Sequence, residues 1–174
     1  MFEIKIQVDE NKKYSKLQEQ IKYDDELDDI TSLVMDMCNY FEEVNLIAFV
    51  VKGFKGLKWP VDVRTDLSSI VPQIPTAIKR LKIRQDCRIQ FFEQGIEREL
   101  HIKCDNSEVV IDCLTLLGAP ATSESEKMHL DELLRMFITL IDNFITIGKS
   151  LCPIITSHHL FTDWESEYYD ARAI

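Results

Sequence analysis

The 174-residue chain is poor in the residues on which recognisable catalytic sites depend. It has only five glycines, and it contains no glycine-rich phosphate loop, no G-x-S-x-G nucleophile elbow and no G-x-G-x-x-G dinucleotide turn. We therefore expect a protein that is not an enzyme and that needs neither a cofactor nor a metal. An enzyme of unfamiliar type would have to show a concave pocket that holds a carboxylate or thiol of strongly shifted pKa.

Long apolar runs are missing as well. The most apolar stretch, residues 130–147, is interrupted by charged side chains at helical spacing, which excludes a membrane span. Residues 1–8 alternate like a strand and lack the basic and apolar regions of a signal peptide. We expect a cytoplasmic protein with a single domain, residues 1–174.

Paired cysteines are also lacking. The five cysteines form no C-x-x-C pair, and an odd number of them cannot all be bridged within one chain. We interpret them as small buried hydrophobic residues in a reducing compartment. A nucleophilic cysteine would instead need a lowered pKa and a nearby base, such as His101 or His129.

Basic charge is scarce outside one stretch. Residues 52–88 hold nine Lys and Arg against three Asp and Glu, a net charge of +6, whereas the rest of the chain carries −16 and the whole chain −10. A field this uneven steers partners but makes no bonds by itself. Because nucleic-acid binders usually combine a basic patch with a basic domain, we expect no nucleic-acid partner. The basic stretch should pair with acids of this protein or of a second subunit.

Period-two alternation predicts about six strands in a mostly antiparallel sheet. The expected strands are residues 2–8, 17–23, 46–51, 87–91, 96–104 and 109–113. The first two form a hairpin, in which Leu17, Ile21 and Tyr23 line the second strand. The third, an unbroken apolar run, is a central strand covered on both faces. The last three form a meander, with turns at Gly95 and at residues 105–107.

Apolar steps of three and four residues predict the helices. The expected helices are residues 25–44, a short helix capped by Thr65, residues 75–82 and residues 130–147. Pro72 and Pro75 prevent one long helix, and Ile74, which precedes a proline, should leave the α region. After a linker, residues 118–124, Ser123 or Ser125 caps the last helix.

The fold class expected from these elements is α+β, in the order ββαβααβββα, with the helices on one face of the sheet. A C-terminal tail, residues 149–174, folds back onto the domain or is partly mobile. The wide apolar stripe of residues 130–147 fits a deeply buried central helix, or a helix whose outer edge also packs on a second copy or another protein.

Two groups of side chains are interpreted as ordinary surface residues. His158 and His159 with Asp163 come nearest to a metal set, but adjacent side chains in a non-helical segment should point apart, and no third ligand is fixed by spacing. Three glutamates could suggest a carboxylate pair for acid–base chemistry, but Glu97 and Glu99 share the polar face of a strand, where solvated charges are expected. They are Glu93, Glu97 and Glu99.

Two acidic clusters are the candidate partner-binding residues. They are Asp24, Asp25, Glu26, Asp28 and Asp29 before the first long helix, and Asp163, Trp164, Glu165, Glu167, Tyr168, Tyr169 and Asp170 in the tail. The first cluster also suits the positive end of a helix dipole. Aromatic residues beside charge are typical of binding hot spots, and equally of a terminus that packs on its own domain.

The residues from Leu67 to Lys103 carry a resemblance to a known group of proteins. The segments LSSIVPQIPTAIKRLK and CRIQFFEQGIERELHIK, about a fifth of the chain, resemble bacterial immunity proteins encoded beside polymorphic or contact-dependent toxins. This resemblance implies a cytoplasmic protein that binds one cognate toxin domain and blocks it sterically and electrostatically. It assigns no functional residue, because the group shares no catalytic motif.

The leading hypothesis is therefore a non-enzymatic protein-binding module, an immunity protein that neutralises a cationic, nuclease-like toxin domain through the two acidic clusters. The alternative is a structural or regulatory subunit that self-associates as a homodimer through residues 130–147. Neither hypothesis involves a membrane.

Overall fold

The computed structural model describes residues 1–9, 12, 15–17, 21–54, 57–92, 97–115 and 125–173. Within these residues, strands and helices form an α+β fold around one cluster of buried hydrophobic residues, which confirms the predicted fold class. The strands divide into two antiparallel sheets, whereas one sheet was predicted.

The first sheet holds the N-terminal strand. Its strands, in spatial order, are β1 (Glu3–Val8), β2 (Ile47–Gly53) and β3 (Leu57–Lys58). The predicted opening hairpin is wrong, because β1 pairs with β2 and the described residues between 15 and 24 form no strand. Leu17 instead donates its N–H to the carbonyl of Leu151 at 2.8 Å. Strand β1 pairs with β2 because the apolar β2 buries more hydrophobic side chains against β1 than the polar residues that follow β1 in the chain could bury.

Strand β2 is central in this sheet, as predicted, but it is covered less completely than expected. Phe49 and Val51 are buried on one face, whereas on the other face Val50 is buried and Ala48 is exposed. An unbroken apolar run therefore overstated the burial of its second face.

The second sheet contains the predicted meander and one additional strand. Its strands, in order, are β4 (Cys87–Phe91), β5 (Arg98–Asp105), β6 (Glu108–Thr115) and β7 (Glu126–His129). Gly95, Ser123 and the expected linker lie outside the described residues. Strand β7 was not predicted. Because it occupies residues 126–129, the last helix begins at Leu130 with His129, and not Ser125, at the N-cap position. Ser125 instead donates a hydrogen bond to Asp112 at 2.5 Å.

The chain stays helical between the two sheets despite its prolines. The successive elements are η1 (Val63–Leu67, a π turn), α2 (Ser68–Ile70), η2 (Val71–Gln73, a 3₁₀ turn) and α3 (Ile74–Lys82). Pro72 and Pro75 each lie in the first turn of an element, where the missing N–H is not needed. Ile74 keeps right-handed helical angles, φ −62° and ψ −42°, so the expectation that it leaves this region is wrong. Asp62, and not Thr65, caps the run by accepting from the N–H of Thr65 at 2.6 Å.

The remaining helices are α1 (Ile30–Glu43), α4 (Leu130–Leu151), α5 (Pro153–Thr156) and α6 (His159–Ala173). Helix α1 begins at residue 30 and not 25, and Leu27, which was expected on its apolar stripe, is 84 % exposed. The tail folds back as α6, whose Phe161, Trp164 and Tyr168 are buried.

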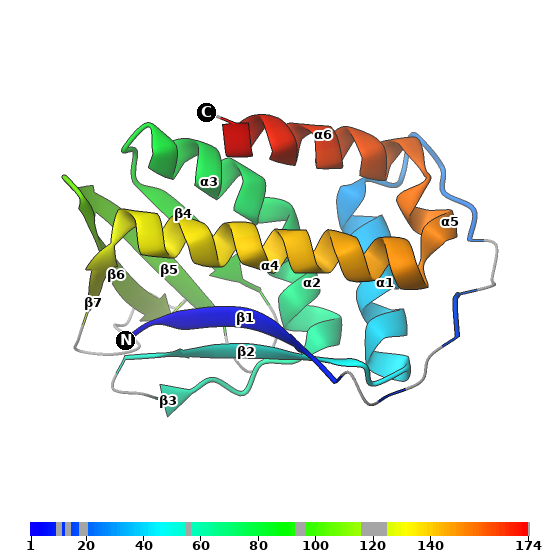
Figure 1. Cartoon of the computed structure of the whole chain (residues 1–174), viewed down its shortest axis with the longest axis horizontal. Helices are drawn as coiled ribbons and strands as arrows, with labels where there is room; N and C mark the ends of the chain where they lie inside the picture. Colours follow the sequence, from blue (N-terminus) through cyan, green and yellow to red (C-terminus); the bar gives the residue numbers. More distant parts are fainter. Residues whose placement is uncertain are drawn as a thin grey trace.

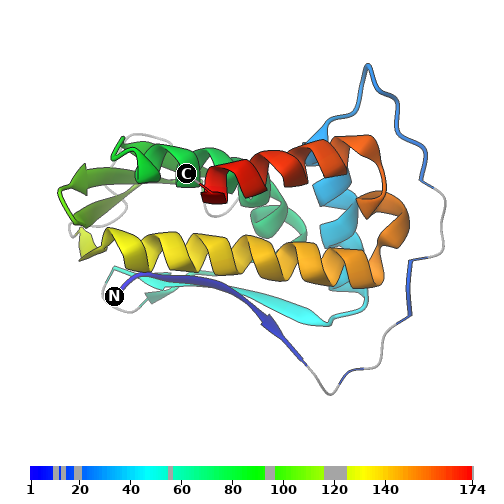
Figure 2. The same cartoon turned by 45° about the horizontal axis from the view of Figure 1, so that its top comes forward.

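Helix α4 is the centre of the molecule. It runs between the first sheet on one side and helices α3 and α6 on the other (Figures 1 and 2). Its apolar positions, including Phe137 and Ile141, are buried there, which confirms the prediction of a central helix. The outward edges of α3 and α6 remain free to form surface sites.

Candidate functional site

Helix α6 separates the residues of the second acidic cluster into an inner and an outer face. On the inner face, Trp164 and Tyr168 are 5 % and 0 % exposed, which fits the alternative that the C-terminal segment packs on its own domain, and not a contact of these two side chains with a partner. The exposed residues of the cluster are Asp163, Glu167, Tyr169 and Asp170. Helix α6 therefore buries Trp164 and Tyr168 in the core and exposes Asp163, Glu167 and Asp170 to solvent.

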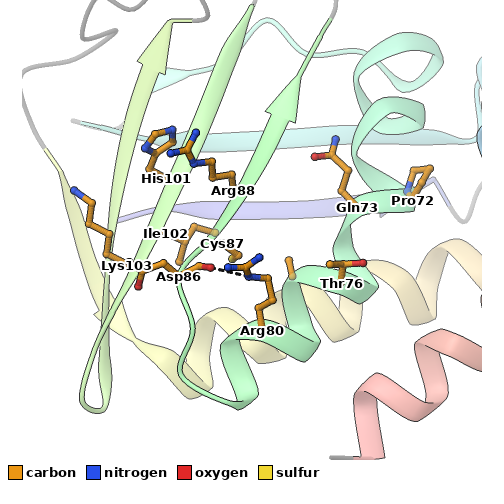
Figure 3. A pocket seen from close by; sticks show the side chains of 11 residues that line it. Pro72, Gln73, Thr76, Arg80, Asp86, Cys87, Arg88, His101, Ile102 and Lys103 are labelled. Atoms are coloured by element: carbon orange, nitrogen blue, oxygen red, sulfur yellow. Dashed lines mark hydrogen bonds between the residues drawn. The ribbon is translucent and has the colours of Figure 1, made fainter.

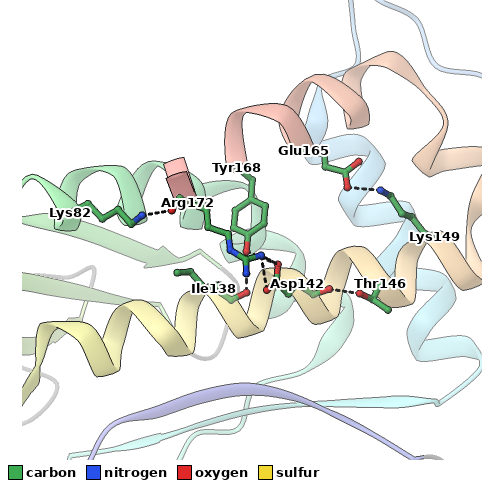
Figure 4. A network of polar contacts seen from close by, with 8 residues as sticks. All are labelled: Lys82, Ile138, Asp142, Thr146, Lys149, Glu165, Tyr168 and Arg172. Carbon is green, nitrogen blue, oxygen red and sulfur yellow. Dashed lines mark hydrogen bonds and ion pairs between the residues drawn. The ribbon is translucent and has the colours of Figure 1, made fainter. Parts of the chain in front are cut away.

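Polar contacts fix α6 against α4 (Figure 4). The hydroxyl of Tyr168 donates to Asp142 Oδ1 at 2.8 Å, and the guanidinium of Arg172 contacts both Asp142 oxygens at 2.9 and 3.0 Å. Burial and the neighbouring Asp142 carboxylate raise the pKa of Tyr168, so its hydroxyl stays a donor at neutral pH. Glu165 is also buried and pairs with Lys149 at 2.5 Å, which removes it from the candidate partner-binding residues.

The first acidic cluster forms a turn and a helix cap. Asp29 Oδ1 accepts from the N–H of Thr31 at 2.7 Å and caps α1. Asp24 and Asp28 bond within the turn, since Asp28 Oδ2 accepts from the N–H of Asp24 at 2.8 Å. This backbone hydrogen bond lowers the pKa of Asp28. The helix-start interpretation therefore applies to Asp29, and Asp24, Asp25 and Glu26 are exposed.

The two clusters meet at the start of α6. Asp25 Oδ1 lies 3.4 Å from His159 Nε2, and Asp163, Glu167 and Asp170 follow His159 at helical spacings of four, four and three residues. We call this surface the acidic strip. Its members are Asp24, Asp25, Glu26, Asp28, Asp29, Asp163, Glu167 and Asp170.

Cationic neighbours of the acidic strip are few. Between described residues, its ion pair is the contact of Asp25 with His159. Lys79 of α3 lines a shallow hollow together with Glu167 and Asp170. The strip therefore keeps most of its negative charge after internal pairing.

The basic stretch lines a separate concavity, which we call the basic hollow. It has a volume of about 700 Å³ and lies between α3 and the strands β4 and β5 (Figure 3). Its charged lining consists of Arg80, Asp86, Arg88, His101 and Lys103. Gln73 closes one side, because its side-chain amide both donates to the carbonyl of Gln90 and accepts from its N–H, at 2.9 and 3.0 Å.

Two cations of the basic hollow, Arg88 and Lys103, have carboxylate partners in the same sheet. Arg88 lies 3.4 Å from the carboxylate of Glu99, which is only 7 % exposed and also contacts His101. Lys103 lies 2.8 Å from Asp112. The hydrogen bond from Lys103 lowers the pKa of Asp112, and the same contact raises the pKa of Lys103. Arg80 donates instead to the backbone carbonyl of Asp86 at 2.8 Å. Within the basic stretch, Lys52 and Arg88 thus pair with acids of this protein, Glu3 and Glu99, and not with the acidic strip.

The hollow offers little nucleophilic chemistry. Burial raises the pKa of Cys87, which lines it, to about 12, and burial also raises the pKa values of Cys38, Cys104, Cys113 and Cys152. A thiol of raised pKa is protonated at neutral pH and is a weak nucleophile. The expected role of the cysteines as packing residues fits these values. Of the three glutamates considered above, Glu93 lies outside the described residues and Glu99 is engaged by Arg88 and His101.

One group of side chains was missed by the sequence analysis. Asp25, His158 and His159 place three possible metal-ligand atoms within 4.8 Å of one another. The adjacent histidines were expected to point apart, but their ring centroids lie 4.5 Å from each other at the start of α6. The third donor is Asp25, more than a hundred residues earlier in the chain, and not Asp163, so no local spacing could have identified it.

Among the helices that the structure describes, none has the length and apolar character that crossing a membrane requires.

Comparison with known proteins adds no assignment to this geometry. No protein-family model, curated protein or solved structure matches the chain.

Proposed function

We propose that the protein is a non-enzymatic protein-binding module that engages a cationic partner through the acidic strip. The observation that carries this proposal is the difference in pairing. Arg88 and Lys103 of the basic hollow each have a carboxylate partner, whereas the acids of the strip make one ion pair among the described residues, between Asp25 and His159. Charge that is not compensated internally is available to a partner, and complementary fields raise association rates.

Affinity additionally needs apolar contacts that are desolvated on binding. Two exposed side chains on the strip can supply them. Leu27 lies 84 % exposed within the acidic turn, and Tyr169 lies 46 % exposed on α6. They take the anchoring role that the sequence had suggested for Trp164 and Tyr168.

The most concrete form of this function is an immunity protein that blocks a basic, nuclease-like toxin domain. Its acids would cover the cationic surface with which such a toxin holds nucleic acid, so that binding prevents access of the substrate without any reaction by the blocker. The resemblance of Leu67 to Lys103 to bacterial immunity proteins supports this choice.

Two variants with the same change of net charge test the proposal. The strip variant carries Asp25→Asn, Asp163→Asn, Glu167→Gln and Asp170→Asn. The control variant carries Glu42→Gln, Glu43→Gln, Glu108→Gln and Asp131→Asn, all at exposed positions outside the strip. The wild-type chain serves as bait in an extract of its native cell, and each captured protein is purified and its affinity for all three chains is measured by calorimetry.

We expect a captured partner of basic isoelectric point that binds the strip variant at least about 100-fold more weakly, a loss of about 2.7 kcal/mol, and the control variant nearly as well as wild type. Equal affinities for the strip and control variants would refute the proposed surface. A partner that binds the strip variant normally but loses affinity for Arg80→Gln would move the binding site to the basic hollow.

Self-association through residues 130–147 has less support. The apolar stripe that suggested it is buried between the first sheet and helices α3 and α6. We expect sedimentation equilibrium to show a monomer at micromolar concentrations, and a concentration-dependent dimer that Met136→Glu abolishes would restore the alternative.

A further inference from the structure

The start of α6 brings together donors that transition metals prefer. A carboxylate oxygen of Asp25 and ring nitrogens of His158 and His159 all lie within 4.8 Å of one another. Imidazole and carboxylate together suit Zn²⁺, Co²⁺ or Ni²⁺, whereas Mg²⁺ and Ca²⁺ favour sites made of oxygen donors alone.

One of the three separations already matches tetrahedral coordination. Zinc binds nitrogen and oxygen at about 2.0 to 2.2 Å, which places neighbouring ligand atoms about 3.4 Å apart in a tetrahedron. The distance between Asp25 Oδ1 and His159 Nε2 is already 3.4 Å. The third donor can close the site by a movement of at most about 1.5 Å, which rotation of a side chain provides.

Neighbouring groups orient the two rings. The ring of Tyr23 packs edge-on against His158 at 5.2 Å, and the hydroxyl of Tyr23 donates to Asp36 on α1 at 2.9 Å. The rings of His158 and His159 lie 4.5 Å apart. The N–H of Leu160 donates to Nδ1 of His158 over 3.4 Å, a long contact that costs little to replace with a metal bond.

We propose that Asp25, His158 and His159 bind one transition-metal ion, preferably Zn²⁺, and that this ion holds the acidic turn against α6. Three protein ligands leave one tetrahedral position for water or for a donor from another molecule. The other acids of the turn, Asp24 and Asp28, lower the local potential and favour a divalent cation. This inference is independent of the proposed function, because it requires no protein partner.

The test uses the full chain after removal of metal with a chelator. Titration with Co²⁺ should give a 1:1 complex with the strong visible absorption of tetrahedral coordination and without the charge-transfer band of a Co²⁺–thiolate bond, which separates this site from the five cysteines. Zn²⁺ should then displace Co²⁺ stoichiometrically. A weak octahedral spectrum, or a thiolate band, would contradict the proposed ligands.

The chain offers matched controls, because it contains four histidines. His159→Ala and Asp25→Asn should each weaken Zn²⁺ binding by more than about 10-fold in calorimetry. His129→Ala and Glu26→Gln, which are exposed residues outside the donor set, should leave it unchanged. All four positions are exposed, so each variant should fold.

A second measurement distinguishes a site from a general effect of charge. Zn²⁺ should slow amide hydrogen exchange in residues 21–29 of the wild-type chain, and not in His159→Ala. If Mg²⁺ at the same concentration slows exchange equally, or if the four variants bind Zn²⁺ alike, then the ions neutralise the acidic turn without specific coordination and the proposal is overturned.

Discussion

The acidic strip and the basic hollow carry opposite charges, but they differ more in how that charge is compensated than in its sign. In the hollow, side chains on adjacent strands contact each other diagonally, so that Arg88 meets Glu99 and Lys103 meets Asp112. On the strip, carboxylates follow one another along one helix face and one turn. On a sheet, unlike charges on neighbouring strands can pair with each other. On α6, the acids spaced three and four residues apart are like charges and cannot pair.

This difference shows why net charge alone is a poor guide to a binding surface. The basic stretch is the most conspicuous charge feature of the sequence, yet its cations mostly contact acids and backbone carbonyls of the same molecule. Arg80, for example, donates to the carbonyl of Asp86 at 2.8 Å. The acids that remain unpaired lie on the opposite edge of α3, along α6, and they are the charge that a partner can use.

The largest effect is expected from removing the support of the acidic strip. Trp164→Ala deletes an indole buried against Phe144 and Phe161 and should lower the free energy of unfolding by about 3 to 5 kcal/mol. Trp164→Phe should cost much less, because the ring volume is largely retained and the indole N–H has no hydrogen-bond acceptor among the described residues. Urea denaturation followed by circular dichroism measures both. Equal losses for the two variants would mean that α6 is not held by this packing.

A smaller loss should follow in the hollow when a buried partner is removed. Glu99→Ala leaves Arg88 and His101 without their shared carboxylate and should cost about 1 to 3 kcal/mol. Asp170→Asn on the strip should stay within about 0.5 kcal/mol of wild type. Urea denaturation measures the free energy of unfolding of both variants. If Asp170→Asn lowers it as much as Glu99→Ala does, the acids of the strip are also paired internally.

Salt should slightly change the effect of the strip's charges on the free energy of unfolding. Asp163 and Glu167 are like charges four residues apart on α6, a spacing that destabilises a helix by about 0.2 to 0.5 kcal/mol. Glu167→Gln should therefore raise the free energy of unfolding by this amount at low ionic strength, and the gain should shrink in 1 M NaCl. A loss of stability at low salt would indicate that Lys79, which lines the same hollow, already compensates Glu167.

The smallest effect is expected in the pH dependence of stability, through the pair of Lys103 and Asp112. Because the hydrogen bond from Lys103 lowers the pKa of Asp112 in the folded state, this carboxylate stabilises the fold above its unfolded pKa of about 3.9. That contribution is lost as the pH falls through the lower folded value. Asp112→Asn and Lys103→Gln should therefore both flatten the acid limb of stability against pH, measured by urea denaturation between pH 7 and 2. An unchanged acid limb in both variants would show that the pair contributes nothing in solution.

The local patterns predicted most of the elements. The alternation of residues 87–91, 98–104 and 109–113 sets the meander, and the stripe of residues 130–147 sets the central helix, because both periods follow directly from backbone geometry. The pairing of β1 was missed because strand partners are chosen by buried area across the whole chain. The four-residue strand β7 was missed because Met128 is its one buried side chain.

The candidate sites were predictable only in part. The acids of the strip are apparent in the sequence, and the burial of Trp164 and Tyr168 could have been inferred from their helical spacing with Phe161. The proximity of Asp25 to His158 and His159, and the pairing of Glu99 with Arg88, depend on contacts between distant segments or neighbouring strands. Local sequence carries no signal for the proximity of Asp25 to the two histidines, and only a weak signal for the pairing of Glu99 with Arg88.

The most direct test of the central claim is the association rate of the purified partner with the wild-type chain, the strip variant and the control variant at low and high ionic strength, measured by stopped-flow fluorescence. We expect the wild type and the control variant to bind rapidly at low salt and to slow steeply as salt is added, whereas the strip variant should bind slowly with little dependence on salt. Equal rates and equal salt dependence for the strip and control variants would contradict it.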